Sequence, residues 1–187
     1  MSIGTVLRSR SRRCARLVQI GLSVCSLAAL VSASFVQPDP RVIYNASDSV
    51  PVGWYRVDPA GLRTDLLPVG SLVMIRLPDA AAALAAQRGY LPISIPLLKR
   101  VGAVAPQEVC VAGGSVRIDG VPVAVALRVD QLGRPLQAWP GCRRLHPGEL
   151  FLLSTTNTAS FDSRYFGPVG AFSVLGVAHP LWLEEDR

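Results

Sequence analysis

The chain contains 18 arginines but a single lysine, Lys99, which lies in the apolar run Ile95–Val101. Wherever a positive charge alone is needed, this sequence uses arginine. Arginine keeps its proton in proteins, whereas a lysine removed from water can lose its proton and act as a base. Lys99 is therefore a candidate general base. The alternative is a strand residue whose ammonium group reaches solvent.

A turn of small residues supplies a candidate nucleophile. It spans residues 45–53 with the sequence N-A-S-D-S-V-P-V-G, which places Ser47 and Ser49 two positions apart. Residues of these types put a hydroxyl on a tight turn that a substrate backbone can approach. The alternative is an ordinary Asx or Ser turn before a strand.

A third polar segment, residues 160–169, has the sequence S-F-D-S-R-Y-F-G-P-V. Asp162 and Arg164 are close enough in the chain to form an ion pair within one loop. Taken alone, this spacing predicts a surface pair that contributes little to stability.

Other kinds of chemistry have no support in the sequence. The two histidines, His146 and His179, are isolated beside prolines, and no G-x-S-x-G, C-x-x-C or H-E-x-x-H motif occurs. The sequence therefore predicts no Ser-His-Asp triad, no metal site and no cofactor.

The net charge of +6 is concentrated at the N-terminus. Five arginines lie within the first 16 residues, which hold no acidic residue, and the remaining 171 residues carry 14 basic and 13 acidic groups. A nucleic-acid-binding face needs clustered positive charge on the folded domain. The near-neutral remainder excludes nucleic acid as the main partner.

An uncharged stretch, Leu17–Val36, follows the basic residues. Twenty residues in a helix span roughly 30 Å, the thickness of the hydrocarbon core of a bilayer. The arginines before it predict a cytoplasmic segment 1–16, an inner-membrane anchor 17–36 and a periplasmic domain 37–187. The alternative is a cleavable signal peptide, with a small-residue cleavage site at Val31–Ala33.

The exported part has the pattern of a mostly β domain. One short helix is expected at Asp79–Arg88, with Asp79 as N-cap and Gly89 as the stop. Gly113-Gly114 and Asp119-Gly120 are hairpin turn signals, and 134–147 is expected to be a loop. Strands are expected at Val42–Tyr44, Trp54–Val57, Ser71–Leu77, Leu97–Val104, Glu108–Ala112, Ser115–Ile118, Val121–Val129, Glu149–Ser154 and Ala171–Ala178.

Four cysteines divide between the two parts of the chain. Cys14 and Cys25 lie in or before the anchor, whereas Cys110 and Cys142 lie in the exported domain. An oxidising compartment favours a disulfide between the latter two. Closing that loop contributes roughly 3–4 kcal/mol in the chain-entropy model.

Together, the three polar segments resemble the signal peptidase I family of Ser-Lys dyad serine proteases, and more closely its TraF-type conjugative transfer peptidases. One departure from the family pattern is Pro106-Gln107-Glu108, where relatives usually carry Pro-Gly-Asp. The matching motifs are the serine turn, R-G-Y-L (88–91), P-L-L-K-R-V (96–101), G-G-x-V-x-I-D-G-x-P-V (113–123), G-R-P-L (133–136) and the 160–169 segment.

The resemblance implies signal-peptidase-like antiparallel sheets with one short helix, plus the N-terminal transmembrane helix. It also implies a role for each polar residue. Ser49 would be the nucleophile and Lys99 the general base, with Ser47 as a side-chain oxyanion donor. Ser160 would orient the lysine, and Asp162 with Arg164 would brace that loop.

The implied function is a membrane-anchored serine endopeptidase that processes an exported precursor, with a conjugative pilin precursor as the expected substrate. The alternatives are a general signal peptidase I, a non-catalytic structural subunit of the secretion or pilus machinery, and a self-cleaving repressor. An extended substrate is expected to add to strands Val42–Tyr44 and Leu97–Val104. Crowding by Val42, Val50 and Leu98 would favour a small residue just before the cut.

Overall fold

The computed structural model describes residues 18–28, 30–31, 42–60 and 67–184. Within the predicted anchor, residues 18–28 and 30–31 are helical, and the basic segment 1–16 lies outside the described residues. No helix in the described ranges is both long and apolar enough to cross a membrane. The chain divides into two compact units, 1–39 and 40–187, and the sheets belong to the second.

The described part of the second unit is mostly antiparallel β-structure, as predicted. It contains the one predicted helix, α2 (Asp79–Gln87). It also contains helix α3 (Ser163–Phe166) and the 3-10 helix η2 (Ala171–Ser173), which the sequence did not predict. Its strands are β1 (Val42–Asn45), β2 (Gly53–Pro59), β3 (Leu72–Ile75), β4 (Leu97–Val104), β5 (Glu108–Ala112), β6 (Ser115–Ile118), β7 (Val121–Val125), β8 (Gly141–Arg144), β9 (Glu149–Leu153), β10 (Val169–Gly170) and β11 (Val174–Leu183).

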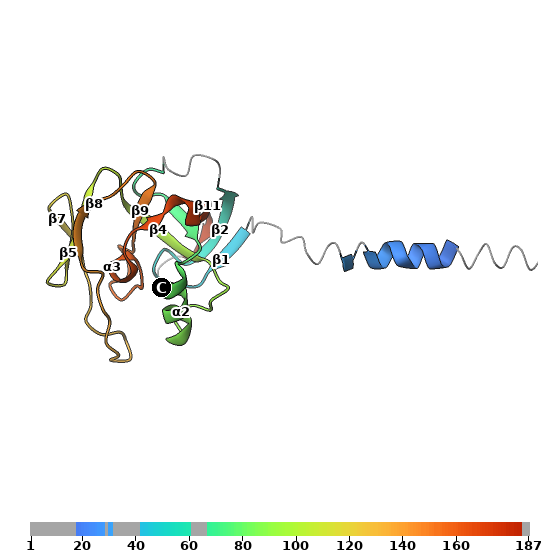
Figure 1. Ribbon diagram of the computed structural model, residues 1–187, viewed down its shortest axis with the longest axis horizontal. Helices are drawn as coiled ribbons and strands as arrows, with labels where there is room; N and C mark the ends of the chain where they lie inside the picture. The colour runs from blue at the N-terminus through green and yellow to red at the C-terminus, as the bar shows by residue number, and fades with distance from the viewer. Residues whose placement is uncertain (1–17, 29, 32–41, 61–66, 185–187) are drawn as a thin grey trace, which may run out of the picture. The chain divides into compact units, whose positions relative to one another are not determined.

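The strands form two sheets. The larger has the order β1-β2-β11-β3-β4-β9-β10, and the smaller has the order β7-β6-β5-β8. The small sheet lies at one end of the domain, with β1, β2 and β11 at the other end and β4 and β9 between them (Figure 1). Strand β1 is therefore an edge strand with one side unpaired by the described strands.

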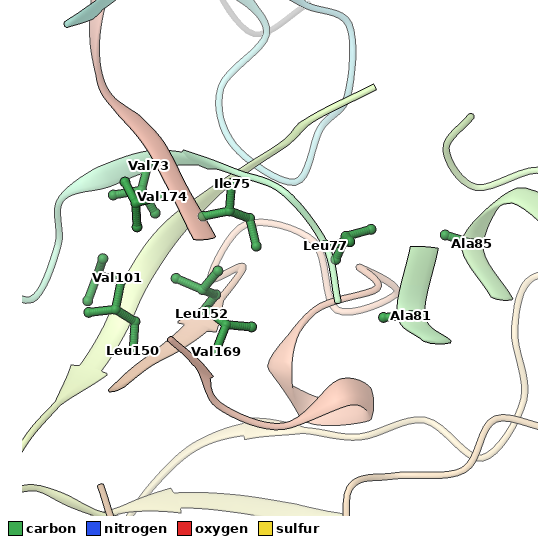
Figure 2. Packing of buried hydrophobic residues seen from close by; sticks show 10 residues of the cluster. All are labelled: Val73, Ile75, Leu77, Ala81, Ala85, Val101, Leu150, Leu152, Val169 and Val174. Atoms are coloured by element: carbon green, nitrogen blue, oxygen red, sulfur yellow. The ribbon is translucent and has the colours of Figure 1, made fainter. Parts of the chain in front are cut away.

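All four side chains of strand β3 are buried. Because successive side chains of a strand point to opposite sides, β3 is buried on both faces. Val73 and Ile75 join a cluster with Val101 of β4, Leu150 and Leu152 of β9, and other buried residues. Ala81 and Ala85 of α2 belong to the same cluster (Figure 2), and their small size lets the helix approach the sheet. Leu72 and Met74 pack on the other face with Tyr55 and Leu98.

Residues with positive φ form both predicted hairpin turns. Gly113 and Gly114 have φ of 59° and 83°, and Asp119 and Gly120 have φ of 50° and 81°. This left-handed conformation is what a tight turn between two strands of right-handed twist requires. The turns connect β5 with β6 and β6 with β7, as expected.

Several sequence predictions differ from the structure. Pro78, not Asp79, occupies the N-cap of α2, and Asp79 lies in the first turn without a side-chain capping bond. Strand β8 lies inside the stretch expected to be a loop, where it pairs with β5. The residues after β4 do form a turn despite the unusual Gln107, whose N–H donates to the Val104 carbonyl and whose side-chain oxygen accepts from the Val104 N–H.

Candidate active site

Asn45 organises the serine turn. Its side-chain amide donates to the carbonyls of Ser47 and Val50 at 2.7 and 3.2 Å, and its side-chain oxygen accepts from the Ser47 N–H. The turn ends at Gly53, which pairs with Asn45 and has φ of 147°. A Cβ at Gly53 would lie 2.2 Å from the Trp182 carbonyl oxygen, so the close approach of β11 requires glycine.

The turn buries Ser49 and leaves Ser47 exposed. The Ser47 hydroxyl donates to Ser49 Oγ at 3.0 Å, and the Ser49 N–H donates to Ser47 Oγ at 3.3 Å. The Ser47 hydroxyl and the Ser49 N–H are therefore neighbouring donors beside the Ser49 side chain. Two such donors can stabilise a developing oxyanion.

Lys99 lies in an apolar wall. It pairs with Val73 across β3 and β4, so it shares a face of the sheet with Val73 and with Val101, two positions along β4. Only 2% of Lys99 is exposed. Burial lowers the pKa of Lys99 to about 8, an effect that Asp162 partly opposes and Arg164 strengthens.

Ser160 accepts a hydrogen bond of 2.5 Å from Lys99 Nζ. The loop that carries Ser160 is held by Arg164, whose guanidinium donates to the carbonyls of Asn157, Thr158 and Ser160. Asp162 binds Arg164 Nε at 2.8 Å and also caps α3 by accepting from the Arg164 N–H. The Asp162–Arg164 pair is completely buried, so the expectation of a surface ion pair from spacing alone is wrong.

A cavity of about 800 Å³ brings four of the predicted site residues together: Ser47, Ser49, Lys99 and Ser160 all line it. Asp162 and Arg164 are not among its lining residues; both are completely buried, and Arg164 bonds the Ser160 carbonyl. Within the described residues, no hydrogen bond joins Lys99 Nζ to Ser49 Oγ.

The three predicted crowding residues do not all line the cavity. Leu98 lines the cavity, but Val42 is 54% exposed and Val50 belongs to a buried hydrophobic cluster. Of these three residues, only Leu98 can therefore crowd a substrate residue just before the cut.

Cys110 and Cys142 form the predicted disulfide. They are directly opposed on β5 and β8, within the small sheet. The bond therefore ties β8 to the hairpin strands and does not contribute to the cavity.

Two motifs that sequence reasoning left without a role meet at the cavity wall. Arg88 and Tyr90 come from R-G-Y-L, and Arg134 comes from G-R-P-L. Tyr90 and Arg134 both donate to the carboxylate of Asp130, and Arg88 donates to the Pro135 carbonyl. The signal available in the sequence was the presence of both motifs, but nothing in their spacing indicates that they touch.

The loop after β9 contains further residues that sequence reasoning missed. Thr156 donates to the Asp48 carbonyl at 2.9 Å, and the Asn157 side chain donates to the Asp48 carboxylate at 2.6 Å. These bonds attach the loop to the serine turn across more than 100 positions of the chain. No pattern of spacing could reveal them.

Comparison with known proteins places the chain in a family. Residues 14–182 match the family model described as signal peptidase, peptidase S26.

Curated relatives extend over most of the chain. A probable conjugal transfer protein TraF of Sinorhizobium fredii is 36% identical over 189 residues, which cover 95% of this chain and 96% of the relative. A conjugal transfer protein TraF of Agrobacterium fabrum is 37% identical over 147 residues, 74% of this chain and 80% of the relative. A plasmid transfer protein TraF of Escherichia coli is 29% identical over 175 residues, 88% of this chain and 94% of the relative.

Among solved structures, a signal peptidase I from Enterococcus faecalis matches with a TM-score of 0.37 and 19% identity. The match covers 59% of this chain and 95% of that one.

Proposed function

This chain belongs to the signal peptidase family, peptidase S26, and we propose that it is a serine endopeptidase that uses Ser49 as nucleophile and Lys99 as general base. The observation that carries the proposal is the environment of Lys99. Its amine is buried in an apolar wall, has a pKa lowered to about 8, and shares a cavity with Ser49. A peptidase of this kind needs a base that is partly neutral near pH 7.

The lowered pKa gives the lysine a usable neutral fraction. With a pKa of about 8, roughly a tenth of Lys99 is neutral at pH 7, against less than about 0.1% for a lysine in water. The neutral amine takes the Ser49 proton as the hydroxyl attacks the scissile carbonyl, and then returns it to the leaving amine. A hydrogen bond between a nucleophile and its general base often tightens only when substrate binds.

Ser160 and Ser47 have separate roles in this mechanism. Ser160 accepts from the Lys99 amine and so fixes its direction. The Ser47 hydroxyl joins the Ser49 N–H in binding the negative oxygen of the tetrahedral intermediate. Asp162 and Arg164 hold the loop that carries Ser160.

An extended peptide can bind through its backbone between two free strand edges. Strand β1 is the edge of the large sheet and contributes Ile43, Tyr44 and Asn45 to the cavity lining. Residues 97–99 of β4 pair with β3, but the ladder between β4 and β9 begins only at Arg100. Their other side is therefore open to a substrate strand, which main-chain hydrogen bonds can hold.

The substrate we propose is the pilin precursor of a conjugative transfer system. The support is that the curated relatives bear names of conjugal or plasmid transfer proteins. The location we propose is the inner membrane, with a single span at 17–36, a cytoplasmic N-terminus and a periplasmic peptidase domain. The support is the run of arginines before an uncharged stretch.

The test compares two substrates. The full chain, solubilised in detergent, is incubated with a pilin precursor from the same conjugative system and with an unrelated secretory precursor. Ser49→Ala should abolish cleavage. Ser71→Ala is the matched control, because among the described residues the Ser71 hydroxyl bonds only the Pro68 carbonyl, at the surface.

Selective cleavage of the pilin precursor supports the proposal. Equal cleavage of both precursors indicates a general signal peptidase. If pilus assembly requires the chain but tolerates Ser49→Ala, the protein is a structural subunit.

A further inference from the structure

Ser154 is a buried hydroxyl that belongs to none of the motifs above. It directly follows β9 and is 3% exposed. Its hydroxyl donates to the Ser49 carbonyl at 2.7 Å and accepts from the Asn157 N–H at 3.1 Å. Its own N–H donates to the Asp162 carboxylate at 2.9 Å. The hydroxyl and the backbone N–H of Ser154 thus both have partners within or next to the active-site loops.

The position of Ser154 directly after β9 explains why it contacts both the serine turn and the Ser160 loop. The ladder between β4 and β9 ends at the pair Arg100 and Leu153. One step further in the same antiparallel register, Ser154 falls opposite Lys99. Ser154 therefore leaves the sheet at the level of the lysine and makes its hydrogen bond to the nucleophile residue instead.

These contacts link the two halves of the dyad, which have no direct hydrogen bond within the described residues. The links are the bonds of Ser154 to the Ser49 carbonyl and to Asp162, the Asp162–Arg164 pair, and the bond of Arg164 to the Ser160 carbonyl. The last link is the bond of Lys99 to the Ser160 hydroxyl. All of these atoms belong to buried residues, so water cannot easily replace a lost bond.

We propose that Ser154 is a positioning residue that holds the backbone of Ser49, and with it the nucleophilic hydroxyl, at a fixed distance from Lys99. The inference rests on the proposed function and adds a residue to it. Ser154 touches neither substrate nor the reacting atoms, and it acts through the Ser49 carbonyl. A displacement of about 1 Å between reacting groups can cost about 100-fold in rate.

Thr156 provides a matched control, because it makes a similar bond to the neighbouring residue. Its hydroxyl donates to the Asp48 carbonyl and lies 3.4 Å from the Ser154 hydroxyl. Thr156 is exposed, however, and bonds neither the Ser49 carbonyl nor Asp162 within the described residues. Water can replace that bond in Thr156→Val. If every bond between this loop and the serine turn contributed equally to the position of Ser49, Thr156→Val and Ser154→Ala would lower kcat equally.

The first measurement is steady-state kinetics of the full chain on a precursor peptide. We expect Ser154→Ala to lower kcat by about 10- to 100-fold while KM changes less than about threefold. Thr156→Val should lower kcat less than about threefold, and Ser154→Thr, which keeps a hydroxyl, should recover part of the loss. A kcat for Ser154→Ala within threefold of the unmodified chain overturns the inference, as does an equal loss in Thr156→Val. Circular dichroism checks that each variant is folded.

The second measurement needs no substrate, so it separates this inference from the proposed function. The Ser49→Cys variant carries a thiol whose alkylation rate is followed against pH, with labelling at residue 49 read by mass spectrometry. A nearby ammonium lowers a thiol pKa. Lys99→Met should therefore raise the pH midpoint of alkylation, and the rise should be larger the closer the Lys99 amine lies to the residue-49 thiol. Adding Ser154→Ala should reduce that Lys99-dependent shift by at least half, and adding Thr156→Val should leave it unchanged.

An undiminished shift with Ser154→Ala overturns the positioning role, even if the chain is a peptidase. A diminished shift supports that role, even if no precursor is cleaved and the proposed function fails.

Discussion

Lys99 Nζ donates a 2.5 Å hydrogen bond to Ser160 Oγ, although the two residues are 61 positions apart in the chain. Strand β4 supplies the amine, and the loop held by Arg164 supplies the acceptor. An ammonium group has three donors and no acceptor, and burial removes the water that would satisfy the others. The site therefore holds a larger neutral fraction of the amine than water does, and the neutral amine is the form that can accept a proton.

Activity should depend on pH through Lys99. Its pKa of about 8 means that the neutral base is lost as the pH falls. We expect kcat/KM to fall about tenfold per pH unit below about pH 8 and to level off above it. A pH-rate profile from pH 5.5 to 9.5 measures this, and a flat profile between pH 6 and 9 would contradict a lysine base.

Lys99→Arg should abolish cleavage, because arginine keeps the charge and most of the bulk but cannot supply a neutral base. Arg100→Lys is the matched control at the next position, where Arg100 donates to the Gly70 carbonyl. It should retain activity within a few-fold. The measurement is precursor cleavage at pH 8 with folding verified by circular dichroism. Substantial activity in Lys99→Arg would remove the proposed mechanism.

Ser47→Ala and Ser160→Ala should have different effects. Loss of one oxyanion donor costs about 100- to 1000-fold in kcat, so Ser47→Ala should be slow with an unchanged pH midpoint. Ser160→Ala removes an acceptor of the lysine ammonium, which disfavours the charged form, so its pH midpoint should move downwards. Rates like those of the unmodified chain in both variants would leave only Ser49 and Lys99 in the site.

Asp162→Asn should destabilise the fold strongly. It leaves the completely buried guanidinium of Arg164 without its counter-charge, which typically costs about 3–5 kcal/mol. Asp58→Asn is the control, since the Arg56–Asp58 pair is about half exposed and solvent screens it. Denaturant unfolding of both variants measures the difference. Equal, small changes would show that Asp162 does not support the Ser160 loop.

The thiols of Cys110 and Cys142 should react with a probe only after reduction. Their disulfide closes a loop with a sequence separation of 32 residues, which corresponds to roughly 3–4 kcal/mol in the chain-entropy model. Replacing both cysteines by serine should therefore lower the unfolding midpoint while the cavity residues stay in place. Labelling of both cysteines without reductant would contradict this prediction.

The sequence by itself determined most of the strands and the identity of the candidate catalytic residues. Strands β4, β5 and β6 have the predicted boundaries, because apolar alternation and glycine turns act locally. A lone lysine among arginines and a serine turn of fixed spacing are equally local signals. Strand β8 was missed because its pairing with β5, 32 positions away at the disulfide, outweighs the prolines and glycines around it.

Only the tertiary structure decided how those residues are held. The sequence could not show that Asp162 and Arg164 are buried, because burial depends on which segments pack above them. It also could not show that Ser154 holds the Ser49 carbonyl, since the two residues are 105 positions apart and belong to no shared motif. Hydrogen bonds of this kind form between loops that the sheet brings together, and the register of β4 with β9 sets where those loops meet.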